Sequence, residues 1–110
     1  MTRSFSALMV VFIATAFFYT PGVFGADLAN GRKVFESYCV GCHKNGGNTV
    51  AADDTLKSAD LKKNGFDSRE AVKKQVINGR GKMPAFGSFL SAGDVEDVAA
   101  YVLNQAGRGW

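Results

Sequence analysis

Five consecutive residues carry the most specific chemistry in this chain. Cys39-Val40-Gly41-Cys42-His43 places two thiols three positions apart and an imidazole directly after the second thiol. This C-x-x-C-H spacing is the attachment signature of c-type haem. The two thiols can add across the two haem vinyl groups, and the adjacent imidazole then faces the iron. The motif therefore predicts that Cys39 and Cys42 hold one haem c covalently and that His43 is an axial iron ligand.

Other uses of the two cysteines have weaker support in the sequence. A thioredoxin-like redox pair lies near a βαβ pattern, which the sequence lacks. A structural zinc site needs four ligands, whereas the chain holds two cysteines and one histidine. A plain disulfide leaves His43 without a role. The same counts exclude a disulfide-dense scaffold, because two cysteines make one bridge at most.

The second axial ligand is expected to be Met83. It is the only methionine after residue 25, and the chain has no second histidine. Pro84 follows it and stiffens the segment that holds the sulfur. His/Met ligation raises the reduction potential and fills both axial sites, which favours electron transfer over catalysis. We therefore expect no enzyme activity. One alternative is that Met83 only fills a gap in the core. The other is that one axial site of the iron is free, as in a haem enzyme or a gas sensor.

The first 25 residues have the layout of a secretory signal peptide. Arg3 gives a positive start, residues 5–19 are almost wholly apolar, and Pro21-Gly22 then break the helix before Ala26. The apolar run of about 15 residues is shorter than the roughly 20 that a spanning helix needs. The expected domains are a cleaved signal peptide, 1–25, and a mono-haem domain, 26–110. An uncleaved anchor is the alternative.

Apolar periodicity predicts an all-α fold of about four helices. The C-x-x-C-H motif then lies at the end of the first helix, where an ordered backbone presents its three side chains. Asp27 and Ser91 are expected helix caps, and Asp67 with Glu70 has the pattern of a capping box. The expected helices are residues 27–38, 55–63 and 67–78 and a last helix from Ser91, with loops at 44–54 and 79–90.

Three of these helices, the first, the third and the last, contain apolar positions that should form the core. Gly31 lies on the apolar face of the first helix, where it either permits a close helix–helix approach or is an indifferent surface glycine. After loss of the leader, 85 residues make a marginal apolar core, which a covalently held macrocycle would support. The expected core positions are Leu28, Val34, Phe35 and Tyr38 in the first helix, Val72 and Val76 in the third, and Val95, Val98, Ala99, Val102, Leu103 and Ala106 in the last.

The charge balance says little about partners. A formal net charge of +3 is too small to indicate a nucleic-acid partner without a basic stripe. Local charges near the iron ligand, Arg80 and Lys82, are better candidates for steering a partner, although Lys82 fits a solvated loop equally well. Val40, Ala85 and Phe86 are candidates for an apolar docking patch around the haem edge, although Val40 and Phe86 fit ordinary core packing as well.

Five segments of the chain form a pattern together. They are Cys39–His43, Gly46-Gly47-Asn48, Gln75–Gly79, Met83-Pro84-Ala85-Phe86-Gly87 and Trp110. In this order and spacing they resemble the cytochrome c6 family, the class I c-type cytochromes of cyanobacteria and algal plastids. The resemblance covers residues 26–110 and implies a class I cytochrome c fold, with about four helices around one covalently bound haem. It implies that Gln75 lies beside the haem edge and that Arg80 meets an acidic partner surface. It also implies that Gly31, Phe35 and Tyr101 meet where the first and last helices cross.

The resemblance also implies a function. Members of this family carry single electrons from cytochrome f of the cytochrome b6f complex to photosystem I in the thylakoid lumen. In cyanobacteria they can also donate to a terminal cytochrome oxidase. A respiratory mono-haem cytochrome c is therefore the alternative function, and the periplasm a further location. We expect a monomer that is not embedded in the membrane and that makes small, transient complexes.

Overall fold

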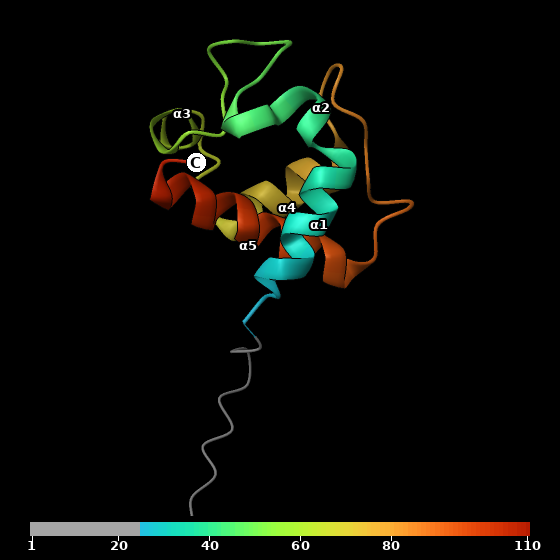
Figure 1. The fold of residues 1–110 in the computed structure, drawn as a ribbon. Coiled ribbons are helices and arrows are strands. Elements are labelled where there is room, and N and C mark those ends of the chain that lie inside the picture. Colours follow the sequence, from blue (N-terminus) through green and yellow to red (C-terminus); the bar gives the residue numbers. More distant parts are fainter. Residues whose placement is uncertain (1–24) are drawn as a thin grey trace, which may run out of the picture.

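The computed structural model describes residues 25–110 (Figure 1). Within these residues every named secondary-structure element is a helix. This confirms the all-α prediction. The predicted signal peptide lies outside the described residues, except for Gly25. Among the described helices, none is long and apolar enough to cross a bilayer. The elements are α1 (Leu28–Tyr38), α2 (Val40–His43), the 3-10 helix η1 (Lys44–Gly46), α3 (Ser58–Lys63), α4 (Arg69–Asn78) and α5 (Ala92–Arg108).

Side-chain caps begin three of the helices. Asp27 and Ser91 each accept the backbone N–H three residues further on, so both predicted caps are confirmed. The predicted capping box of Asp67 and Glu70 is wrong. Ser68 caps α4 instead, because its extended backbone lets its hydroxyl accept the N–H of the third residue after it.

Helix α3 begins three residues later than predicted, at Ser58 instead of Thr55. The reason lies in the Asp60 carboxylate, which accepts both the Thr55 backbone N–H at 3.0 Å and the Thr55 hydroxyl at 2.6 Å. These bonds hold Thr55 outside the helix. They also stabilise the ionised carboxylate, so the pKa of Asp60 lies below its ordinary value.

This lowered pKa makes a prediction about acid stability. An acid whose folded-state pKa is depressed stabilises the fold above its ordinary pKa, and the contribution is lost as pH falls through the folded value. We expect Asp60→Asn to melt at a lower temperature than the unsubstituted protein near pH 7. The two melting temperatures should converge as the pH falls below the ordinary pKa of an aspartate, about 3.9. Circular dichroism measures both melting temperatures. If their difference stayed constant from pH 7 to pH 2, the charge of Asp60 would not be the cause of the effect.

Helices α1 and α5 cross in close contact (Figure 1). A Cβ placed on Gly31 would lie 2.7 Å from the carbonyl carbon of Asp97 and 2.8 Å from the Cβ of Tyr101. Gly31 therefore serves the close approach, and the surface alternative is wrong. Beside it, the Asn30 amide donates to Asp94 and to Asp97 across the two helices at 2.9 and 2.8 Å.

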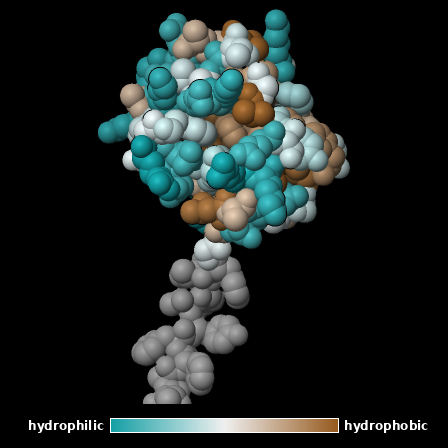
Figure 2. Space-filling view, in the orientation of Figure 1, coloured by the Kyte–Doolittle hydropathy of each residue, from teal (hydrophilic) through white to brown (hydrophobic). Residues whose placement is uncertain are grey.

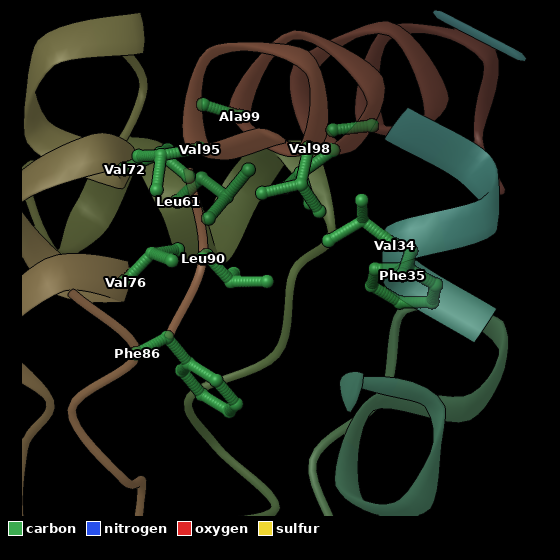
Figure 3. Close-up of a cluster of buried hydrophobic side chains, with 12 residues drawn as sticks. Val34, Phe35, Leu61, Val72, Val76, Phe86, Leu90, Val95, Val98 and Ala99 are labelled. Carbon is green, nitrogen blue, oxygen red and sulfur yellow. The ribbon is translucent and has the colours of Figure 1, made fainter. Parts of the chain in front are cut away.

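The core lies between α5 and the helices and loop around it (Figure 3). The predicted α5 stripe is buried, with Leu103 half-buried and packed against it. Two α1 expectations are wrong, because Leu28 and Tyr38 are 42% and 50% exposed. The loop after α4 contributes Phe86 and Leu90, so Phe86 belongs to the core. The buried apolar residues are Val34, Phe35, Leu61, Val72, Val76, Phe86, Leu90, Val95, Val98, Ala99, Ala100, Val102 and Ala106.

Candidate haem-binding site

All six residues proposed from the sequence as site residues line one cavity. Its volume is about 420 Å³, within the roughly 300–1,000 Å³ of typical small-molecule sites. The residues that line the cavity come from segments far apart in the sequence, from the end of α1 to α5, and its remaining walls are mostly apolar. Apolar walls suit the faces of a macrocycle. The six residues are Cys39, Cys42, His43, Gln75, Arg80 and Met83.

The C-x-x-C-H motif forms a single helical turn of its own. Helix α1 ends at Tyr38, and the next residue, Cys39, has a φ of −115°, well away from the helical value of about −63°. The chain then turns again, since the N–H groups of Cys42 and His43 both donate to the Cys39 carbonyl, at 3.2 and 2.9 Å. The prediction placed the motif at the end of the first helix, whereas in the structure Val40–His43 form a separate short helix, α2, which η1 follows.

The two thiols are unpaired in the structure, so the disulfide alternative is not formed. Cys42 is exposed and Cys39 is half-buried. Burial raises the pKa of Cys39 to about 11, so its thiol is neutral near pH 7. A neutral buried thiol is a poor redox or metal-binding thiolate. Within residues 25–110, no three His, Cys, Asp or Glu side chains converge as a metal site would require, which removes the zinc alternative.

A backbone carbonyl fixes the imidazole of His43. Its Nδ1 lies 2.8 Å from the Gly47 carbonyl oxygen. A carbonyl can only accept, so Nδ1 carries the proton and the lone pair belongs to Nε2. An imidazole held in this way presents Nε2 to a metal. The carbonyl is brought back by a tight turn in which Asn45 and Gly46 take positive φ values of 54° and 74°.

A second tight turn presents Met83. The backbone of Arg80 and that of Met83 exchange two hydrogen bonds, of 3.0 and 2.9 Å. Gly79 precedes this turn with a φ of 66°, and a Cβ there would lie 2.6 Å from the Met83 carbonyl oxygen. Gln75 on α4 points its Nε2 at the Met83 sulfur, 3.6 Å away. The Arg80 side chain is exposed at the cavity.

The donor set therefore comprises two thiols, one oriented imidazole and one oriented thioether around an apolar cavity. Thiols attach haem vinyl groups, and imidazole and thioether are the axial pair of cytochromes c. The residues present fit a covalently bound haem.

Comparisons with known proteins agree with this geometry. The family model described as "Cytochrome C oxidase, cbb3-type, subunit III" matches residues 26–102. Cytochrome c6 of Thermosynechococcus vestitus is 44% identical over 110 residues, which cover 100% of this chain and 98% of that protein. The chain belongs to the cytochrome c6 family. Cytochrome c6 of Porphyra purpurea is 42% identical over 110 residues, which cover 100% of both proteins.

Solved structures of this family have the same fold. Cytochrome c6 of the diatom Phaeodactylum tricornutum superposes with a TM-score of 0.74 at 36% identity, covering 76% of this chain and 99% of that one. Cytochrome c6C of Synechococcus sp. PCC 7002 gives a TM-score of 0.72 at 42% identity, covering 74% and 99%. Family membership confirms a photosynthetic electron carrier, not an enzyme, with one covalent haem c.

Two features at the site have no clear sequence signal. The Gly47 carbonyl is a backbone group, which residue types do not reveal. Tyr38 and Phe89 form an exposed aromatic pair with ring centroids 5.7 Å apart, stacked around the buried Phe86. Phe89 is 54% exposed. The position of Phe89, an aromatic residue in the Gly-rich loop 79–90, is the one sequence feature that could have predicted this pair.

Proposed function

We propose that Cys39 and Cys42 hold the haem through two thioethers and that His43 and Met83 ligate its iron. The observation that carries this proposal is the convergence of all four side chains on one cavity. Haem supplies a reversible one-electron change of its iron when bound. The chain itself supplies apolar walls and two ligands, each held by a partner group. Ligands held in this way change position little between the two oxidation states, which keeps reorganisation small.

We infer that the carrier accepts electrons from cytochrome f and delivers them to photosystem I in the thylakoid lumen. The distribution of charged residues supports docking of partners at the cavity, away from the acidic start of α1. Asp27, Asp94 and Asp97 gather at the start of α1, about 16 Å from its other end for an 11-residue helix. Arg80 and Lys82 lie at the cavity, whose lining also includes Asp54 and Asp60. The pair of cations in the Met83 turn would attract an acidic partner surface to that part of the cavity and raise the association rate.

The apolar part of the docking surface differs from the one proposed from sequence. Phe86 is buried, whereas Val40, Tyr38 and Phe89 are exposed. The face visible in Figure 2 is mainly hydrophilic, with separate apolar residues between polar ones. A small apolar rim of this kind suits a brief redox encounter and not a stable dimer, which buries roughly 800 Å² on each partner. We therefore propose a monomer.

Laser-flash kinetics with photosystem I particles test the proposed function. The rate of re-reduction of the photo-oxidised centre should rise with the concentration of the reduced carrier. We expect Arg80→Glu to slow this reaction about tenfold at low salt, with a smaller effect at high salt. Arg69→Glu makes the same charge change at a residue that does not line the cavity, and it should have little effect. A re-reduction rate that does not depend on the carrier would overturn the photosynthetic proposal.

A respiratory role is the second candidate. The match to a family described as an oxidase subunit favours it. The chain would then also reduce a terminal cytochrome oxidase, from the periplasm or from the lumen. Oxygen uptake by oxidase-containing membranes, with and without the reduced carrier, separates the two roles.

We also propose that residues 1–25 are a signal peptide removed on export. A positive start, an apolar run and small residues before Ala26 support this proposal. Amino-terminal sequencing of the exported haem protein should begin at Ala26. An exported protein that still carries residues 5–19 would instead indicate an anchor.

A further inference from the structure

The last residue of the chain is held in an unusual conformation. Trp110 has a φ of 59°, a left-handed value that non-glycine residues seldom adopt. It follows Gly109, the left-handed cap of α5, and its N–H donates to the Gln105 carbonyl at 2.8 Å. A strained backbone of this kind persists only where surrounding contacts determine it. The ring supplies such contacts, since it packs on Phe35 and Tyr101 with centroids 5.3 and 6.2 Å away.

The indole lies against the segment that follows the C-x-x-C-H motif. A Cβ on Gly46 would lie 2.5 Å from three atoms of the Trp110 ring, so the ring covers this buried glycine directly. The indole Nε1 donates to the Leu56 carbonyl at 2.8 Å. Leu56 in turn donates its N–H to the Gly46 carbonyl at 2.8 Å. Figure 1 shows the carboxyl end of the chain beside this segment, before α3.

The covered segment is the one that orients the imidazole. Gly47 follows Gly46 directly, and its carbonyl accepts from His43 Nδ1. The turn itself contains two left-handed residues, Asn45 and Gly46. Two backbone hydrogen bonds close it, from Gly47 N–H to the Lys44 carbonyl and from Thr49 N–H to the Cys42 carbonyl, both at 3.0 Å. The Trp110 ring over Gly46 adds a contact from outside the turn.

We propose that Trp110 is the positioning residue for the axial histidine. Its ring and its Nε1–H hold Gly46 and Leu56, and so keep the Gly47 carbonyl against His43 Nδ1. The carbonyl fixes the ring orientation and the basicity of the ligating imidazole. This inference rests on the proposed ligation by His43. It assigns Trp110 a role in orienting the His43 imidazole, in addition to filling the space between α1 and α5.

Two variants of the haem-loaded protein separate the effect of the Trp110 ring over Gly46 from that of its Nε1–H bond to Leu56. Trp110→Phe keeps an aromatic ring over Gly46 and removes the Nε1–H donor. Removal of Trp110 deletes both the ring and the donor. Val95→Ala is the control, because Val95 is buried on α5, the helix that Trp110 follows, but does not line the cavity. It should reduce stability without touching the turn.

Proton NMR of the two oxidation states gives the readout. In the reduced protein, solvent exchange of the His43 Nδ1 proton should be about tenfold faster in Trp110→Phe, which corresponds to the loss of one hydrogen bond. It should be faster still without Trp110. In the oxidised protein, the pattern of haem methyl shifts, which reports the imidazole orientation, should change in the same order. Val95→Ala should leave both observables as in the unsubstituted protein.

The outcomes distinguish this inference from the ligation on which it rests. If the His43 ring protons of the unsubstituted oxidised protein show no paramagnetic shift, His43 is not a ligand and the proposed function fails. If they are shifted but both Trp110 variants exchange as the unsubstituted protein does, only the role of Trp110 is refuted. Equal changes in Val95→Ala would also refute it, because they would show a general effect of stability.

Discussion

Replacing Met83 with alanine is expected to lower the reduction potential of the haem-loaded protein by roughly 0.1–0.3 V, within the span of about 0.8 V that axial ligands set. The thioether raises the potential of cytochromes c, and its loss leaves one axial position free. We therefore also expect the reduced variant to bind carbon monoxide rapidly at neutral pH, which a six-coordinate iron resists. Redox titration and carbon monoxide binding measure the two effects.

The surroundings of Met83 provide a matched control. Lys82 precedes it in the same turn, lines the same cavity and is exposed. Lys82→Ala removes a side chain from this loop without removing a ligand, so its potential should change far less than that of Met83→Ala. The backbone bonds between Arg80 and Met83 do not involve side chains, and the turn should persist in both variants. An unchanged potential in Met83→Ala would show that another group ligates the iron.

The candidate donor residues could be chosen from the sequence because the chain has so few of them. With two cysteines and one histidine, and a single methionine after the leader, composition and spacing leave little choice. All of these residues line the cavity in the structure. The groups that orient the donors were harder to predict. The Gly47 carbonyl depends on left-handed residues at 45 and 46, and the indole of Trp110 reaches Leu56 across 54 positions of sequence.

The errors in the predicted elements also have physical reasons. Helical periodicity identified four helices, but it does not register a side chain that pulls its neighbour out of a helix, as Asp60 does with Thr55. It placed Tyr38 on a buried face because it treats α1 as packed along its whole length. Helix α1 in fact ends at the cavity, so its last aromatic side chain lies at the rim. A local side-chain hydrogen bond decided the position of Thr55, and the way α1 packs decided that of Tyr38.

Gly31→Ala is expected to lower the free energy of unfolding of the loaded protein by about 2–3 kcal/mol. Alanine is favoured over glycine within a helix by about 1 kcal/mol, so local propensity alone predicts a gain. Packing reverses the sign. The added methyl group would meet the backbone of Asp97, which cannot turn aside as a flexible side chain can. Helices α1 and α5 would have to separate, and the core between them would lose contacts.

Gly107→Ala is the matched control, because it makes the same change in another helix. A Cβ at Gly107 has nothing within 4 Å, so only helix propensity acts and stability should rise by up to about 1 kcal/mol. Denaturant unfolding of the two variants therefore gives opposite signs for one substitution. If Gly31→Ala were as stable as Gly107→Ala, the close crossing of α1 and α5 would not be the support on which this small domain depends. The C-x-x-C-H turn begins where α1 ends, so a shifted crossing would also move both thiols and His43 relative to Met83.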